Sequence, residues 1–343
     1  EVPCIQTPPR GGAGDAFDIV QGQGLVVVTY FATPAALKSV FRTLPGEDFI
    51  TSADFHYDTL AGEFASQRRY VVALPADTRL HTDNVNRWTR WHDYTGALWR
   101  DALGIPRATP RPMLALEGTG DGGVHVGCCY PDLLKVWEER LEWVKQQGFG
   151  YILLHTPEWV SAVNRVTPII RGNNCCPFEF KLSEHLGGEA GHKGFIDAAH
   201  RQGLEIFFWV SGHLAAEAPT FKQHPEWLLQ NAVHQPESCG YKVILSMAML
   251  AGCPEWIFED LCRVKNTTGV DGLWWDSFPT LTLQGINYQS PGREPNAPAV
   301  FKLLGRLSEI GYEHIFEGLS QLGISCYTDL EGWNFTDQDD MLY

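Results

Sequence analysis

Residues 270–277 read Val-Asp-Gly-Leu-Trp-Trp-Asp-Ser, a short apolar run that closes on a carboxylate. Because successive residues of a strand point to opposite sides, Trp274 and Trp275 are expected to divide between the interior of a barrel and the side that faces its helices. Asp276 follows directly, so the run predicts a buried strand that presents a carboxylate at its C-terminal end. An aspartate that only caps the next turn is the alternative interpretation.

Strand-like and helix-like segments alternate around this run, throughout residues 111–343. Continuous apolar strands separated by helices predict a parallel sheet that is covered on both faces. An open doubly wound sheet and a closed (β/α)8 TIM-type barrel both fit, but no Gly-rich phosphate loop follows the first strand, which favours the barrel. Strands are predicted over 113–116, 151–154, 204–210, 270–275, 314–316 and 324–327, and helices from 131 onward and over 193–202, 254–264 and 297–310.

The predicted barrel contains about six strands, whereas the fold requires eight. We therefore expect a barrel that is incomplete at the C-terminus. The chain opens on Glu1, and this is compatible with processing or with a fragment.

The first part of the chain has a different pattern. Runs over 25–31 and 70–74 are rich in β-branched and aromatic residues, and they predict a β-rich module. An apolar stripe predicts a helix over 86–103, and a Pro-rich stretch follows it. The predicted organisation is a β-rich sandwich remnant over 1–80, a connector helix and linker over 81–110, and the (β/α) barrel as catalytic domain over 111–343.

Composition limits the classes of partner. A formal charge of −15 repels phosphate backbones, which argues against nucleic acid and leaves neutral ligands such as sugars. No apolar stretch of 18 residues occurs, so no membrane partner is predicted and both a cytoplasmic and an exported protein fit. The 9 cysteines show no CxxC spacing, so we predict free thiols and no metal site. The sequence does not indicate the oligomeric state.

Polar residues follow the predicted strands, and in a barrel the functional side chains lie at these C-terminal ends. Cleavage of a glycosidic bond with retention uses a nucleophilic carboxylate and a second carboxylic acid about 5–5.5 Å away. Asp276 is the candidate nucleophile. Asp329 ends a strand-like run and is the candidate acid, while Glu317 ends the preceding strand and is a candidate for binding sugar hydroxyls.

Aromatic rings and histidines complete the predicted site. Trp209 and Trp275 lie at or near predicted strand ends, where their rings could stack on the faces of a sugar; a place in the core is the alternative for each. His155 and His213 also follow strands and are pocket candidates, with satisfied structural histidines as the alternative.

Several motifs resemble the melibiase-like α-galactosidase and raffinose synthase group of glycoside hydrolases. The segments GLEIFFWV (203–210) and KQHPEWL (222–228) are similar to that group's GLKFGLWV and KHPDWVL. VDGLWWD (270–276), with PEWIF (254–258) before it, resembles the group's IDYIKWD strand and its preceding helix. EGLS (317–320) is similar to the start of ENCSSGG, and GEDFIT (46–51) to GESFTTP.

This resemblance implies a β-supersandwich followed by a catalytic barrel, no cofactor, Asp276 as nucleophile and Trp209 facing the sugar. The sequence departs from the group at several positions. His155-Thr156 stands in place of two galactose-binding aspartates, tryptophan replaces the lysine before the nucleophile, and Ser211 or Gly212 replaces a glutamate. The Gly-rich GGGRFD loop is missing, so Asp329 is assigned by its location after a strand.

The predicted function is therefore a retaining glycoside hydrolase, α-galactosidase-like, with an oligosaccharide or glycoside as its partner and an α-linked sugar as its target. Two alternatives stay open. One is a transglycosidase of the raffinose synthase type, in which a sugar hydroxyl replaces water in the second step. The other is a catalytically silent carbohydrate-binding barrel.

Overall fold

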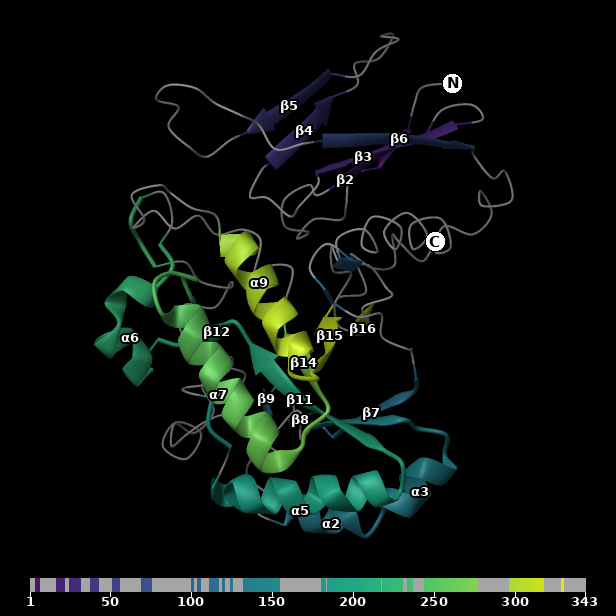
Figure 1. The fold of residues 1–343 in the computed structure, drawn as a ribbon, viewed down its shortest axis with the longest axis vertical. Helices are drawn as coiled ribbons and strands as arrows, with labels where there is room; N and C mark the ends of the chain where they lie inside the picture. Colours follow the sequence, from purple (N-terminus) through teal and green to yellow (C-terminus); the bar gives the residue numbers. More distant parts are fainter. Residues whose placement is uncertain are drawn as a thin grey trace.

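The computed structural model gives a parallel α/β arrangement preceded by antiparallel strands (Figure 1). It describes residues 4–6, 17–21, 25–31, 38–42, 51–55, 69–75, 100–101, 104–105, 111–116, 119–120, 124–125, 132–154, 180–182, 184–216, 218–230, 233–236, 244–276, 296–317 and 328–329.

The central sheet is parallel throughout the part of the chain that the structure describes. Its strands, in spatial order, are β7 (Met113–Leu116), β10 (Tyr151–Leu154), β11 (Glu205–Ser211), β14 (Gly272–Asp276), β15 (Glu313–Glu317) and β16 (Thr328–Asp329). Spatial order equals chain order, and every pairing is parallel. A doubly wound sheet reverses direction at a switch point, and these strands do not. The prediction of a parallel sheet with alternating helices is confirmed.

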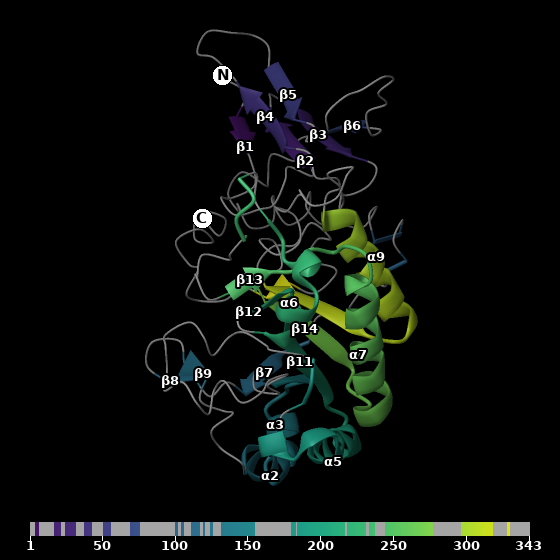
Figure 2. The same cartoon turned by 90° about the vertical axis from the view of Figure 1, so that its left-hand side faces the viewer.

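Helices α5 (Gly188–Arg201), α7 (Cys253–Thr268) and α9 (Asn296–Glu309) each lead into the next strand of the sheet. Figure 2 shows α7 and α9 side by side along the sheet, with α5 beyond the lower end of α7. Gly269 at the end of α7 has a φ of 77°, a left-handed conformation that ends a helix at little cost for glycine. The chain can therefore turn at once into β14.

The predicted helix from residue 131 is instead two short helices, α2 (Leu133–Glu138) and α3 (Leu141–Gln146). Leu134, Leu141 and Val144 are buried as predicted, so the apolar stripe continues across the break. The last predicted strand, over 324–327, lies outside the described residues, and β16 begins directly after it. Most of the predicted connector helix over 86–103 also lies outside them.

Both faces of the sheet are buried. On β11, the ring of Phe208 contacts that of His192 on α5, with centroids 5.7 Å apart, so this side faces the helices. Phe207 points to the other side because strand residues alternate, and its ring meets Tyr151 edge-on at 4.8 Å. We call the side of Phe208 the helix face and the side of Phe207 the inner face. A parallel sheet buried on both faces explains why its strands are continuously apolar.

The strands of the first 75 residues form sheets of their own. Strands β1 (Cys4–Gln6), β2 (Phe17–Gln21), β3 (Leu25–Phe31) and β6 (Arg69–Pro75) pair antiparallel in that order, and β4 (Lys38–Arg42) pairs with β5 (Thr51–Phe55). β3 lies at the residues where a strand-like run was predicted. The boundaries at 80 and 110 stay a prediction.

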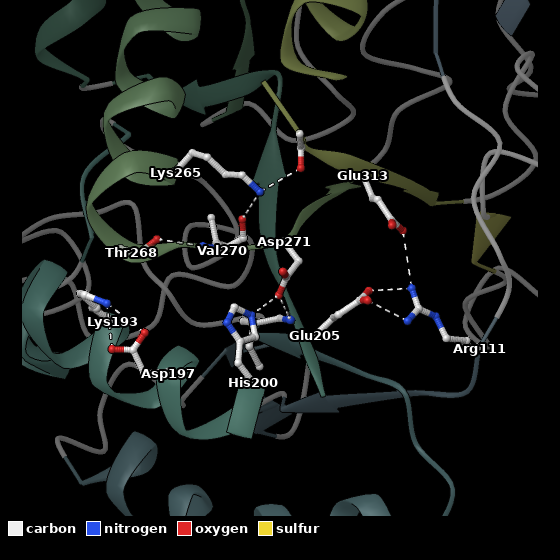
Figure 3. A network of polar contacts seen from close by, with 12 residues as sticks. Arg111, Lys193, Asp197, His200, Glu205, Lys265, Thr268, Val270, Asp271 and Glu313 are labelled. Atoms are coloured by element: carbon white, nitrogen blue, oxygen red, sulfur yellow. Dashed lines mark hydrogen bonds and ion pairs between the residues drawn. The ribbon is translucent and has the colours of Figure 1, made fainter. Parts of the chain in front are cut away.

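The N-terminal ends of the strands are joined by a network of polar side chains (Figure 3). Arg111, just before β7, donates to both carboxylate oxygens of Glu205 at 2.7 and 2.6 Å and to the hydroxyl of Tyr151 at 2.5 Å. Its guanidinium also lies 3.9 Å from the carboxylate of Glu313. One planar cation thus connects the starts of β7, β10, β11 and β15, a use that suits the forked donors of arginine.

Further contacts hold the turns at the same end of the sheet. Asp271 accepts a hydrogen bond from the backbone N–H of Ile206 at 2.8 Å, and its carboxylate lies 2.8 Å from Nε2 of His200. Lys265 donates to the carbonyls of Val270 and Gly311 at 2.7 and 2.8 Å. These contacts fix where β11, β14 and β15 begin. In a barrel, the N-terminal ends of the strands serve stability, and contacts that keep the strands aligned fit that role.

None of the helices in the part of the chain that the structure describes has both the length and the apolar character needed to cross a bilayer.

Gly272 is the point at which the inner face has no space for a side chain. It is paired in register with Phe207, and a Cβ atom added at Gly272 would lie 1.9 Å from Cε1 of the Phe207 ring. We expect Gly272→Ala to lower the free energy of unfolding by about 1–3 kcal/mol or more, because the ring or the strand must move. Chemical denaturation measures this.

The matched control is Gly194→Ala, in the middle of α5, where an added Cβ meets nothing within 4 Å. There the same change should stabilise the protein slightly, because alanine favours a helix. Equal effects at the two positions would contradict the packing described for Gly272.

Glu313 provides a test of the polar network. Burial, followed by the nearby Glu205 carboxylate, raises the pKa of Glu313, while Arg111 opposes the shift. The folded protein therefore binds this proton more tightly than the unfolded chain, and ionisation of Glu313 destabilises the fold as pH rises through its raised pKa. We expect Glu313→Gln to raise the melting temperature at pH 7, with the gain shrinking toward pH 4. A gain of the same size and pH dependence in Glu259→Gln, exposed on α7, would contradict this account.

Candidate active site

The C-terminal ends of four neighbouring strands carry polar residues at one level of the sheet. Ser211 of β11 is in register with Asp276 of β14, and Glu317 of β15 is in register with Asp329 of β16. Trp275 of β14 is paired with Phe316 of β15. The next residues along these strands, Asp276 and Glu317, therefore lie beside each other. We call Ser211, Asp276, Glu317 and Asp329 the strand-end row. The structure describes the last three by their backbone.

Two indole rings lie one level below this row. Trp209 and Trp274 are paired in register, two residues before Ser211 and Asp276 respectively, and therefore belong to the inner face. They are 5% and 1% exposed. Both rings are therefore buried on the inner face, at the level before the row. The sequence predicts Trp209 as a site residue. Trp274 is added by the structure, because the register shows that Trp274 and not Trp275 lies on the same face of the strand as Asp276.

The structure gives Trp275 a different place from the predicted one. It lies on the helix face, 3% exposed, where its indole N–H donates to Nδ1 of His314 at 3.0 Å. Burial lowers the pKa of His314 to about 4, so its ring is neutral and Nδ1 is free to accept. Trp275 thus links β14 to β15 immediately before Asp276 and packs in the core.

His213 lies in β12 (His213–Ala215), just beyond the row, and is 2% exposed. Its backbone N–H donates to the hydroxyl of Ser211 at 3.1 Å. Burial lowers the pKa of His213 to about 3, so the ring is uncharged at neutral pH. The other predicted histidine, His155, follows β10 by one residue and lies outside the described residues.

The chain between β11 and α7 builds a wall at this end of the sheet. It comprises β12, α6 (Pro219–Gln223), the 3-10 helix η4 (Pro225–Trp227) and β13 (Ile244–Ser246). Figure 2 shows β12, β13 and α6 close to β14. Within it, Trp227 stacks on His224 with ring centroids 3.9 Å apart and donates to the carbonyl of Ala251 at 3.0 Å. These aromatic contacts come from the KQHPEWL segment.

Carboxylate-bearing residues at neighbouring strand ends suit acid–base and nucleophilic chemistry. Among the residues that the structure describes, no group of three or more His, Cys, Asp or Glu side chains could hold a metal ion.

A scan of family models and a search of curated proteins each found no match to this sequence. Comparison with solved structures did find similar folds. The GH36 α-galactosidase AgaA from Geobacillus stearothermophilus, as a variant in complex with 1-deoxygalactonojirimycin, matches with a TM-score of 0.60 and 11% identity over 99% of this chain and 49% of that one. The α-galactosidase TtGalA from Thermus thermophilus, in complex with p-nitrophenyl α-D-galactopyranoside, gives 0.56 and 14% over 94% and 59%.

A third similar fold is the α-N-acetylgalactosaminidase NagBb from Bifidobacterium bifidum in complex with GalNAc, with a TM-score of 0.54 and 13% identity over 97% of this chain and 57% of that one. The present chain spans less than two thirds of the length of each of these three proteins. At such low identity the comparisons establish a common fold, which is that of glycoside hydrolases from several bacteria.

The contact between Trp275 and His314 yields a prediction about acid stability. The unfolded chain takes up a proton on this histidine below its ordinary pKa of 6.5, whereas the folded protein does so only near 4. Stability should therefore fall as pH drops from 6.5 to about 4, by roughly 3 kcal/mol from this group. We expect His314→Gln, which can still accept from Trp275, to flatten that part of the curve.

Denaturant titrations between pH 8 and 4 measure the effect. A constant offset between the two proteins above pH 7 reflects packing alone and serves as the internal reference. Parallel curves for the wild type and the variant down to pH 4 would show that His314 is not held neutral by the fold.

Proposed function

We propose that this chain is a retaining glycoside hydrolase that cleaves an α-linked sugar of the α-galactoside type, with Asp276 as nucleophile and Asp329 as general acid. The observation that carries the proposal is the register of β11, β14, β15 and β16, which gathers Ser211, Asp276, Glu317 and Asp329 into one row. Similarity in fold to α-galactosidases supports the choice of substrate.

In the first step, a carboxylate oxygen of Asp276 attacks the anomeric carbon of the sugar. The bond to the glycosidic oxygen breaks, and that oxygen takes the proton of Asp329 as the alcohol leaves. In the second step, Asp329 accepts a proton from water, and the water oxygen displaces Asp276 from the anomeric carbon. Two inversions leave the sugar with its original configuration, and both carboxyl groups return to their starting states.

The strand spacing is compatible with this pair. Neighbouring strands lie about 4.8 Å apart, so the backbones of Asp276 and Asp329, two strands apart, are separated by about 10 Å. Side chains that converge on the inner face of a curved sheet bring the two carboxyl groups closer together than their backbones are. Retaining enzymes hold their carboxyl groups about 5–5.5 Å apart.

The remaining predicted residues have supporting roles in this proposal. Glu317, between the two carboxylates, accepts hydrogen bonds from sugar hydroxyls, and Trp209 provides the apolar surface below the ring. His155 and His213 border the pocket on the β10 and β11 sides. Trp275 acts from the helix face, by holding the strand that ends in Asp276.

The proposed architecture is a (β/α)8 TIM-type barrel over 111–343, after a β-sandwich part over 1–80 and a connector over 81–110. The sequential parallel order supports the barrel, since it winds in one direction from β7 to β16. The antiparallel sheet β1-β2-β3-β6 supports the sandwich part.

A panel of aryl α- and β-glycosides tests this function directly. Asp276→Asn preserves the shape of the side chain but removes the attacking charge, so kcat should fall by about three orders of magnitude or more, equivalent to about 4 kcal/mol of barrier. The matched control is Asp197→Asn, on the exposed face of α5, where an aspartate pairs only with surface charges such as Lys193. Its kcat should equal that of the wild type.

Chemical rescue identifies the role of the carboxylate. In Asp276→Gly, azide should occupy the vacated space and attack the anomeric carbon of an activated aryl α-glycoside, forming a glycosyl azide of inverted configuration. Turnover by the wild type that persists in Asp276→Asn would contradict the assignment. Sugar binding without turnover in the wild type as well as in the variants would indicate the catalytically silent barrel instead.

A further inference from the structure

Asn296 is the first residue of α9 and is fully buried, at 0% exposure. Asparagine at the start of a helix usually caps that helix. Here its side-chain amide bonds a different segment: Nδ2 donates to the carbonyl of Met247 at 3.0 Å, and Oδ1 accepts from the backbone N–H of Met249 at 2.6 Å. The C=O of one residue and the N–H two residues later are the groups that an adjacent strand would bond. The amide therefore takes the place of a strand partner.

The segment 247–249 is held from two other directions. The N–H of Met247 donates to the carbonyl of Gly212 at 3.2 Å, and the N–H of Ala248 donates to the carbonyl of Trp227 at 2.7 Å. Met247 and Ala248 are each 1% exposed, so the segment is packed inside the wall of the candidate site. A buried backbone group that loses its partner costs about 1–3 kcal/mol, so each of these bonds constrains the path of the chain.

These contacts lead directly to the strand-end row. Gly212 follows Ser211, which is in register with Asp276. The amide of Asn296 thus joins the start of α9, through Met247, to Gly212 beside Ser211.

We propose that Asn296 is a positioning residue. It fixes the segment 247–249 against the end of β11 and thereby sets the geometry of the strand-end row around Asp276. This role rests on the function proposed above. It explains why a polar side chain is completely buried at the start of α9. Asn296 touches neither the sugar nor Asp276 in this proposal and acts through Met247 and Gly212.

Asn296→Asp tests the role with almost no change in shape. One carboxylate oxygen can still accept from Met249, but the other faces the carbonyl of Met247, where two acceptors repel each other. We expect kcat to fall about 10- to 100-fold while KM changes less than about threefold, since small displacements of catalytic groups reduce the rate strongly. Asn296→Ser, which can keep one of the two bonds, should show an intermediate loss and carries the test if the aspartate variant does not fold.

The matched control is Asn266→Asp. Asn266 is exposed on α7, and its amide donates to the sulfur of Cys262 at 3.5 Å. It undergoes the same chemical change near the opposite end of the strands. Its kcat and KM should equal those of the wild type.

Hydrogen exchange provides a readout that does not depend on turnover. In Asn296→Asp, amides of the peptide covering 247–250 should exchange at least about tenfold faster, because their protection depends on the clamped segment. Amides of β15 (Glu313–Glu317) should keep their wild-type rates and so report on the sheet itself.

The outcomes separate the two proposals. Unchanged hydrogen-exchange rates over 247–250 in Asn296→Asp would show that Asn296 does not hold this segment, which we call the clamp, in place. Faster exchange with an unchanged kcat would overturn the positioning role. A wild type that cleaves no glycoside, together with faster exchange in the variant, would overturn the proposed function while the clamp itself is supported.

Discussion

The arrangement of this protein depends on parallel strand pairing in strict chain order. Each strand of the central sheet after β7 pairs with the strand of that sheet that precedes it in the chain, and the registers bring the C-terminal residues of β11, β14, β15 and β16 to one level. A slip of one residue in β14 would move Asp276 away from the row and exchange the faces of Trp274 and Trp275. The close fit of the Phe207 ring over Gly272 and the bond from Trp275 to His314 oppose such a slip from the two faces of the sheet.

The two ends of the sheet differ in their chemistry. The N-terminal ends are joined by charged groups, with Arg111 bonded to Glu205 and close to Glu313. The side chains of Arg111 and Glu205 are 35% and 31% exposed, so solvent screening limits what their ion pair adds to stability, and their main effect is on alignment. The C-terminal ends carry the row above buried indoles. Groups that align the strands and groups suited to catalysis are therefore separated by the length of the strands.

Much of the local structure could be predicted from the sequence. The strands over 113–116 and 151–154 appear at the predicted residues, because a short apolar run ended by polar residues depends on local pattern alone. Asp276 was recognisable at the end of such a run. The sequence could not show which of the adjacent tryptophans shares its face, since that depends on pairing with β11 and β15. Nor could it reveal Asn296, whose partners are 47 and 49 residues away. The break between α2 and α3 was missed because Leu134, Leu141 and Val144 keep helical spacing across it.

The central claim is that Asp276 forms a covalent bond to the sugar. An activated fluorinated α-galactoside reacts with a retaining nucleophile faster than water releases the product, so the intermediate accumulates and can be digested and located by mass spectrometry. The account predicts one sugar per chain, bound through an ester to Asp276 in the peptide covering 270–277. Turnover of α-galactosides with the label on another residue, or with inverted product and no label, would contradict it.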